Sequence, residues 1–201
     1  MAIHYRTKGF IFKKSDRFEA DRLFKIFTYD FGKIEILARA IRKITSKLRA
    51  GAEVFYLSEI EFIQGKTRKT LTNALAIEKF LVARTKLRRL RTAYQIAAIF
   101  DKLVKGEEKD ERIWELLKET FVKLNSSNEG RWDLAILYYY FFWNLLALLG
   151  YEPDLYLCSI CRERLAPGKL YLDINGGGLV CSPCFEKHSF DNIPQPIKLT
   201  P

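Results

Sequence analysis

The four cysteines of this 201-residue chain occur in two closely spaced pairs, and this pattern constrains the fold more than any other feature of the sequence. The spacing is C-x2-C-x19-C-x2-C, and the spacer length is typical of a zinc site. Two such pairs supply four thiolates, which form a tetrahedral shell that Zn²⁺ accepts without strain. The sequence therefore predicts one bound Zn²⁺ ion, with the ligands Cys158, Cys161, Cys181 and Cys184.

Disulfides or free thiols are the alternative interpretation of the four cysteines. Disulfides need an oxidising compartment, and the N-terminal sequence MAIHYRTKGF has neither the apolar core nor the small-residue cleavage site of a signal peptide. This favours zinc and a cytoplasmic, nucleoid-associated protein. Because four cysteines leave no position open for water, and no H-x-E or H-E-x-x-H motif accompanies them, we expect a structural ion.

Two further features limit the class of partner. The net charge of +10 indicates a polyanionic partner, either nucleic acid or an acidic membrane surface, with a merely soluble basic surface as the alternative. The apolar segment 134–149 is shorter than the roughly 20 residues that a membrane-spanning helix needs. We therefore expect this segment to be the buried central helix of a bundle, ended by Gly150.

The first 78 residues alternate between apolar and polar positions in short runs separated by turn residues. Five such runs predict a small closed barrel, with the OB-fold as the leading candidate and an SH3-like barrel as the alternative. The predicted strands are 5–14, 21–30, 32–40, 54–65 and 70–78.

Helical periodicity replaces the strand pattern after this region, with predicted helices over 87–106, 111–125 and 134–149. The run KLYLDI predicts a small β-hairpin between the cysteine pairs. The predicted fold class is α+β: an N-terminal five-stranded OB-fold barrel and a C-terminal helical domain with an inserted four-cysteine zinc-finger module. The expected domains are 1–78 for the barrel, 79–153 together with 187–201 for the helical domain, and 154–186 for the module.

The stretch RAIRKITSKLRAG, residues 39–51, is basic and contains no acidic residue. It follows the third predicted strand, so we expect a long barrel loop whose cations neutralise phosphates. A solvated loop is the alternative interpretation. The predicted DNA-binding residues of this loop are Arg39, Arg42, Lys43, Lys47 and Arg49.

Other candidates for nucleic-acid contacts carry alternatives. A second basic run contains Arg88 and Arg89 and equally fits the exposed face of a helix. Phe10, Phe12 and Phe31 would stack on bases if they were exposed, although ordinary barrel core is the commoner role for phenylalanine. The sequence contains no phosphate-binding loop, no G-x-G-x-x-G and no G-x-S-x-G, so we expect a protein that is not an enzyme.

Four segments, in this order and spacing, resemble the bacterial DNA repair protein RecO family. They are EADRLFKIFT (19–28), FGKIEILARAIRK (31–43), SKLRAGAEVFYLSEIEF (46–62) and LLALLGYEPDLYLCSIC (145–161). The resemblance implies an OB-fold, a helical domain and a zinc finger. It also implies DNA-binding roles for the cations of 39–49, and adds Arg17, Arg22 and Lys33, which lie within or beside these segments, as further DNA-binding candidates.

The function that this resemblance implies is that of a recombination mediator. Such proteins bind single- and double-stranded DNA and anneal complementary strands. With RecR they assist the loading of RecA onto DNA covered by single-strand-binding protein. The alternative is a zinc-ribbon adaptor that binds proteins and has no direct DNA role, and a zinc hydrolase or deaminase is a third reading that the four-cysteine shell disfavours.

Overall fold

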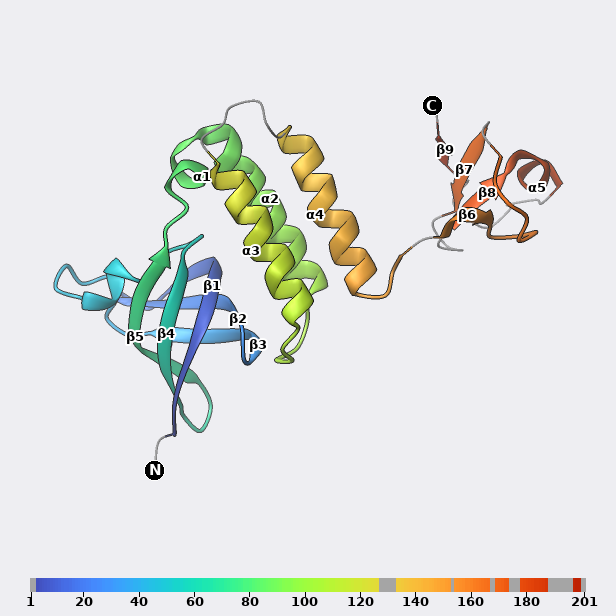
Figure 1. Cartoon of the computed structure of the whole chain (residues 1–201). Coiled ribbons are helices and arrows are strands. Elements are labelled where there is room, and N and C mark those ends of the chain that lie inside the picture. The colour runs from blue at the N-terminus through green and yellow to red at the C-terminus, as the bar shows by residue number, and fades with distance from the viewer. Residues whose placement is uncertain are drawn as a thin grey trace. The chain divides into compact units, whose positions relative to one another are not determined.

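The computed structural model divides the chain into two compact units, Met1–Leu145 and Leu146–Pro201. It describes residues 3–126, 133–152, 154–166, 169–173 and 178–187, and the backbone of 197–199 (Figure 1). Among these residues, no helix combines the length and the apolar character that crossing a bilayer requires.

The first unit begins with a five-stranded barrel, which confirms the predicted OB-like fold. The strands close in the order β1-β2-β3-β5-β4. Closure depends on a short parallel pairing in which Ile36 of β3 lies beside Lys69 of β5 and Leu37 beside Thr70. The strands are β1 (Ile3–Arg17), β2 (Asp21–Thr28), β3 (Gly32–Ala38), β4 (Leu57–Gln64) and β5 (Lys69–Glu78).

The barrel interior is filled by the apolar residues that alternate along the strands. Fully buried members include Phe24, Ile26 and Ile36. The pairing of β1 with β2 shifts register between Ile11 and Lys13. Bulges of this kind bend a strand and re-aim its side chains, and here the buried residues on both sides of Ile11 contact the helices instead of the barrel interior.

The helices of the first unit follow the barrel directly. The predicted helices are confirmed, and Asp110 caps one of them by accepting the backbone N–H groups of Arg112 and Ile113 at 2.9 and 3.2 Å. Gly150 follows the last helix with a φ of +82°, as expected for a residue that ends a helix. The helices are α1 (Leu81–Thr85), α2 (Leu87–Leu103), α3 (Glu111–Asn125) and α4 (Leu134–Leu148).

Aromatic rings join the barrel to α2 and α3. The ring centroid of Phe10 lies 4.4 Å from that of Phe121, and Phe12 and Phe27 each lie 5.1 Å from Phe100. Edge and tilted contacts of this kind stabilise an interface beyond the area that they bury. The proposed base-stacking role of Phe10 and Phe12 is therefore wrong, because both are core residues.

Phe31 is likewise not free to stack on a base. It is half-buried and packs edge-on against Tyr5 and Phe62 at the barrel core. The core interpretation of the three phenylalanines is the correct one.

The expectation that 134–149 is the buried central helix of a bundle is wrong. Helix α4 buries one stripe, formed by Leu137, Phe141 and Leu145. Ile136 and Trp143 on other faces are 62% and 47% exposed. A helix that is apolar all round usually lies at the centre of a bundle, but in the described residues α4 lies at the edge of one.

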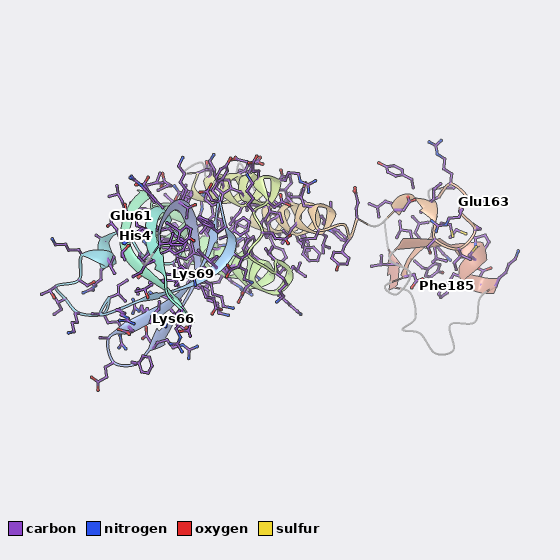
Figure 2. All side chains as sticks on the ribbon, turned by 90° about the horizontal axis from the view of Figure 1, so that it is seen from below. His4, Glu61, Lys66, Lys69, Glu163 and Phe185 are labelled. Atoms are coloured by element: carbon purple, nitrogen blue, oxygen red, sulfur yellow. The ribbon has the colours of Figure 1, made fainter. Side chains whose placement is uncertain are left out.

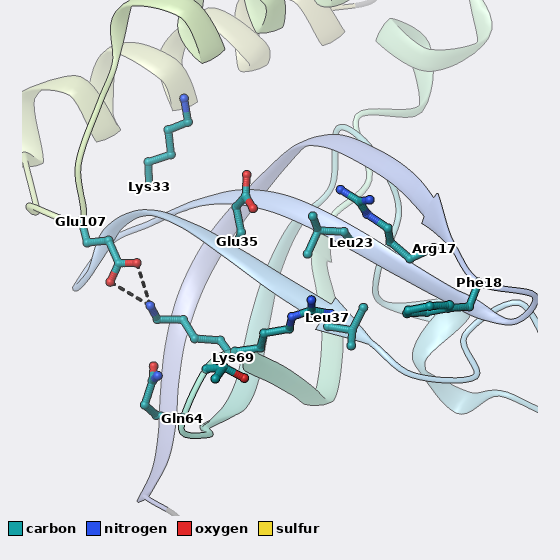
Figure 3. A pocket seen from close by; sticks show the side chains of 11 residues that line it. Arg17, Phe18, Leu23, Lys33, Glu35, Leu37, Gln64, Lys69 and Glu107 are labelled. Carbon is teal, nitrogen blue, oxygen red and sulfur yellow. Dashed lines mark hydrogen bonds and ion pairs between the residues drawn. The ribbon is translucent and has the colours of Figure 1, made fainter.

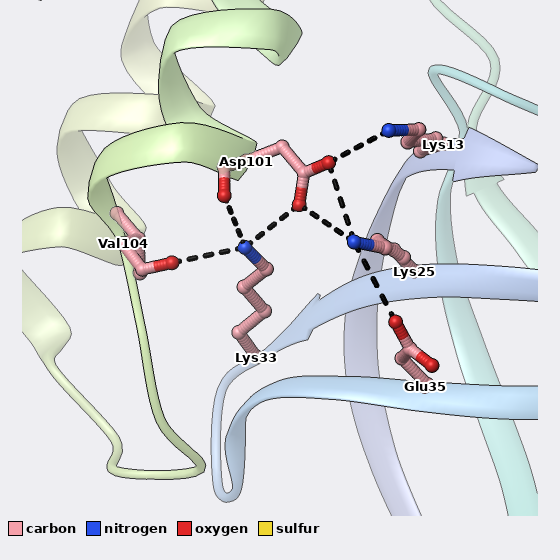
Figure 4. Close-up of polar contacts among 6 residues, drawn as sticks. All are labelled: Lys13, Lys25, Lys33, Glu35, Asp101 and Val104. Carbon is pink, nitrogen blue, oxygen red and sulfur yellow. Dashed lines mark hydrogen bonds and ion pairs between the residues drawn. The ribbon is translucent and has the colours of Figure 1, made fainter.

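A cluster centred on Asp101 of α2 ties the helices to three barrel strands (Figure 4). Its carboxylate pairs with Lys13 of β1 at 2.9 Å, Lys25 of β2 at 3.1 Å and Lys33 of β3 at 2.8 Å. Lys33 also donates to the backbone carbonyls of Asp101 and Val104 at 2.6 and 2.9 Å. Burial alone would raise the pKa of Asp101, but the hydrogen bonds from the lysines hold it well below its usual value.

In its described residues, the second unit consists of a small sheet and one short helix, which lies between the last two strands in the sequence. Strands β7 and β8 pair antiparallel, which confirms the predicted hairpin strands. The placement of 187–201 in the helical domain is wrong for 197–199, which form a strand that pairs with the free edge of β7. The elements are β6 (Asp154–Cys158), β7 (Leu170–Asp173), β8 (Gly178–Cys181), α5 (Ser182–Lys187) and β9 (Ile197–Leu199), with sheet order β6-β8-β7-β9.

Asp101→Asn should destabilise the first unit by about 3 kcal/mol at pH 7, because it leaves buried Lys33 without its counter-charge. Urea unfolding measures the difference. Because the pKa of Asp101 is depressed in the folded protein, its contribution is fully present above the ordinary value of 3.8 and is lost as the pH falls below it. The difference in unfolding free energy between the unaltered protein and Asp101→Asn should therefore be constant from pH 7 to pH 5. It should become smaller as the pH falls further.

The matched control is Glu115→Gln, which removes a carboxylate from an exposed pair with Lys118. This change should cost less than about 1 kcal/mol. Equal effects of the two substitutions would contradict the assigned role of Asp101.

Candidate metal centre and nucleic-acid interface

The four cysteines converge in the second unit. Their sulfur atoms all lie within 4.8 Å of one another, and the sulfurs of Cys161 and Cys181 are 3.9 Å apart. A disulfide would hold two sulfurs about 2.05 Å apart. Zn–S bonds of about 2.3 Å in a tetrahedron place neighbouring sulfurs about 3.8 Å apart. None of the four cysteines forms a disulfide. The arrangement therefore fits four thiolates around one ion.

Local backbone geometry creates this convergence. Cys158 ends β6, and a tight turn brings Cys161 back beside it. In this turn Arg162 has a φ of +60°, and the N–H of Arg162 donates to the carbonyl of Cys158 at 2.9 Å. Cys181 ends β8, and Cys184 lies one turn further on in α5. The strand pairing of β6 with β8 places the two cysteine pairs side by side.

The electrostatics of the four sulfurs favour a bound cation. Burial disfavours the thiolate of Cys158, but the backbone N–H groups of Cys181, Cys161 and Ile160 lower its pKa to about 6. Partial burial and the neighbouring sulfurs raise the pKa of Cys184 to about 12. Four thiolates in so small a space repel one another, so full deprotonation needs a compensating positive charge.

The apolar core among the described residues of the second unit is small. Its buried apolar residues include Leu179 and Val180, and the ring of Tyr171 stacks on that of Phe185 with the centroids 3.8 Å apart. Figure 2 labels Phe185 in this unit. So small a core is marginal without cross-links. A metal held by the four cysteines would supply the missing stabilisation.

The basic stretch 39–51 is the predicted loop, between β3 and β4, and two contacts fix its start. The N–H of Ala40 donates to the carboxylate of Asp21 at 2.8 Å, and the N–H of Arg42 donates to the carbonyl of Ala20 at 3.0 Å. Ile41 is buried in the barrel core. With its backbone anchored in this way, the loop presents its cations to solvent: Arg39, Arg42, Lys43, Lys47 and Arg49 are all exposed.

Acidic neighbours engage two of the predicted arginines. Arg22 pairs with Asp16 at 2.7 Å, and Arg42 lies 3.7 Å from the same carboxylate. Arg17 is exposed at the end of β1, and Arg88 is exposed in the first turn of α2.

Two predicted DNA-binding residues are instead used inside the protein. The side chain of Lys33 is 11% exposed and is held by the Asp101 cluster. Arg89 donates to the carbonyl of Leu124 at 2.9 Å and to that of Ser126, and so fixes the end of α3. Both side chains therefore already have partners that lie far away in the sequence, and a DNA contact through either of them stays a prediction.

A hollow that the sequence did not reveal lies between the β1–β2 turn and the β4–β5 turn (Figure 3). It comprises two adjoining cavities of about 590 and 760 Å³ that share Phe18, Leu37, Thr67 and Arg68. Both volumes lie within the range of ligand sites. We call this hollow the barrel groove, and its remaining cationic lining includes Arg17, Arg39, Lys66 and Lys69.

The run QGKTRK between the fourth and fifth strands was a signal for this site. OB-folds bind oligonucleotides with the turns between these same pairs of strands. A basic turn at that place therefore fits the same interpretation as the loop 39–51. Arg39 lines the groove and also begins that loop, so the two cationic surfaces are continuous.

Comparison with known proteins agrees with this architecture. The family model described as recombination protein O N terminal matches residues 1–80, which span the barrel. The model described as recombination protein O C terminal matches residues 84–198, which span helices α2 to α4 and most of the second unit. The chain belongs to the recombination protein O (RecO) family.

Individual relatives match nearly the whole chain. A DNA repair protein RecO from Dehalococcoides mccartyi is 31% identical over 180 residues, which are 90% of this chain and 70% of the relative. One from Roseiflexus is 33% identical over 180 residues, 90% of this chain and 62% of the relative. One from Listeria monocytogenes is 28% identical over 185 residues, 92% of this chain and 70% of the relative.

Cys161→Ser in this RecO-family chain should weaken metal binding by more than about 100-fold. Loss of a residue that only hydrogen-bonds to a ligand already lowers metal affinity by about 10- to 100-fold, and this change removes a ligand itself. Metal analysis of the purified protein measures the loss, and cobalt substitution should give intense thiolate bands in the unaltered protein. The control is Ser182→Ala, which removes the neighbouring hydroxyl that donates to the carbonyl of Lys169. A metal-free unaltered protein, or one with no titratable thiols after denaturation, would contradict a four-thiolate site.

Proposed function

We propose that this chain acts in DNA repair by binding single- and double-stranded DNA with its barrel. Membership of the RecO family supports the role in DNA repair. The observation that carries the proposal is the anchored loop 39–51, which holds five exposed cations beside the cationic barrel groove.

The charges of this loop are available to a ligand. Among the described residues, no carboxylate lies within ion-pair distance of Arg39, Lys43, Lys47 or Arg49. Arg42 lies 3.7 Å from the carboxylate of Asp16, which also pairs with Arg22. The contact between Arg42 and Asp16 is exposed and therefore weak, so a phosphate can replace the carboxylate. Lysine and arginine that neutralise phosphates release counterions, which gives affinity without sequence preference.

The same surface supports strand annealing as part of the proposed function. Contacts to the backbone position a strand but leave the edges of its bases free. A strand bound through phosphates therefore keeps its pairing edges available for a complement. The cations also reduce the repulsion between two backbones that approach each other.

The remaining steps of the proposal come from the family resemblance. We propose that the chain works with RecR to assist the loading of RecA onto strands covered by single-strand-binding protein. We further propose that it is not an enzyme and that one structural Zn²⁺ ion occupies the four cysteines. The closed set of thiolates supports an ion that stabilises the fold, because it leaves no ligand position for water.

Alanine at all five loop positions (Arg39, Arg42, Lys43, Lys47 and Arg49) should weaken binding to single-stranded DNA and flatten its salt dependence. Each cation that neutralises a phosphate contributes about 0.7 to the slope of log K against log salt on a single strand. Fluorescence anisotropy of a labelled oligonucleotide, titrated across a salt series, measures both affinity and slope.

The matched control removes the same charge from exposed positions on α2, α3 and their connection: Lys102, Lys105, Lys109, Arg112 and Lys118. This control should retain most of the slope. An unchanged slope in the loop variant would move the DNA site elsewhere. No binding by the unaltered protein at low salt would favour the protein-adaptor interpretation.

A further inference from the structure

The barrel groove contains an exposed aromatic ring that the fold does not use. Phe18 lies in the turn between β1 and β2 and is 78% exposed. Its φ of +51° lies in the left-handed region, which bulky side chains rarely adopt. Because the ring is exposed, it contributes little hydrophobic free energy to folding, and the positive φ adds backbone strain. Folding alone therefore does not explain a phenylalanine at this position.

Cations surround this ring. Arg17 directly precedes it, Arg68 lines both cavities of the groove beside it, and Arg39 lines one of them. All three are exposed, and among the described residues none has a carboxylate within ion-pair distance. Leu37 lies beside the ring at the same end of the groove (Figure 3). An aromatic face next to several unpaired cations is the combination with which proteins hold single strands.

The other end of the groove is acidic and already neutralised. Glu107 pairs with Lys69 at 2.7 Å, and the carboxylate of Glu35 lies 3.5 Å from Lys25 (Figure 3 shows both carboxylates at this end). Carboxylates there repel phosphates and leave no unpaired cation to attract them. Asp21 also lines the groove near Phe18, where its carboxylate accepts the N–H of Ala40. The unpaired cations Arg17, Arg39 and Arg68 outnumber it there, so the end that contains Phe18 is the one that attracts a polyanion.

We propose that the barrel groove binds single-stranded nucleic acid, with one unpaired base stacked on Phe18 and the adjoining phosphates on Arg17, Arg39 and Arg68. This inference rests on the proposed DNA-binding function and deepens it. The loop 39–51 neutralises the backbone of a strand or a duplex alike. The ring of Phe18 selects a single strand, because the bases of a duplex already have both faces covered by their neighbours.

The test replaces the ring without disturbing the turn. Asparagine tolerates a positive φ, so Phe18→Asn should fold with an unchanged or higher thermal midpoint. It should bind a short mixed-sequence single strand about tenfold more weakly than the unaltered protein, and a duplex within about twofold of it. An aromatic replacement, Phe18→Trp, should restore single-strand affinity.

A strand in which abasic sites replace the bases supplies the second arm, because it keeps the phosphates and lacks any base to stack. The unaltered protein should bind this strand about tenfold more weakly than the normal one, whereas Phe18→Asn should bind both equally, as expected when the ring and a base interact directly. The control is Ile44→Asn, which removes a 92% exposed apolar side chain from the basic loop. This control should leave the preference for the normal strand intact.

The outcomes separate this inference from the proposed function. If Phe18→Asn binds single strands as tightly as the unaltered protein does, stacking on Phe18 is overturned and DNA binding by the barrel stands. If Ile44→Asn loses the preference equally, the ring has no specific role. If the unaltered protein binds no DNA at low salt, the proposed function itself fails.

Discussion

One carboxylate on α2, that of Asp101, holds the barrel and the helices of the first unit together. It pairs with lysines from three consecutive strands, so the strands are bound to the same helix and the repulsion among their like charges is reduced (Figure 4). This cluster also divides the cations of a strongly basic chain into two groups. Lys13, Lys25 and Lys33 are used to build the fold, whereas the cations of 39–51 and Arg17 and Arg68 of the barrel groove remain exposed to a ligand.

The aromatic contacts between barrel and helices make the same junction rigid. The ring of Phe100 packs against rings from β1 and β2. The ring of Phe121 packs against those of Phe10, Phe55 and Phe80. A binding surface made of loops needs such a support, because loops gain precision from the elements that carry them. The loop 39–51 is one example, since its buried Ile41 and its bond to Asp21 fix its start on the barrel.

Local patterns in the sequence were sufficient to predict the barrel strands, helices α2 to α4 and the grouping of the four cysteines. Strand and helix periodicities differ clearly between the two parts of the first unit, and the cysteine spacing defines its own geometry. The features that the sequence did not reveal depend on contacts between residues far apart in the chain. The partner of Lys33 lies 68 residues away, and that of Arg89 lies 35 residues away. The strand at 197–199 and the exposed faces of α4 likewise depend on which neighbours are present, and Phe18 emerged as a candidate only when its exposure and backbone angle were known.

The most direct test of DNA binding by the barrel is the ¹⁵N–¹H correlation spectrum of the labelled protein, recorded as a short single-stranded oligonucleotide is added. We expect the amide shifts of 17–18, 39–49 and 65–68 to change together and saturate, while those of 154–166 and 178–187 stay in place. Changes confined to the second unit, or no changes at low salt, would contradict the claim that the barrel of this RecO-family chain is its DNA-binding surface.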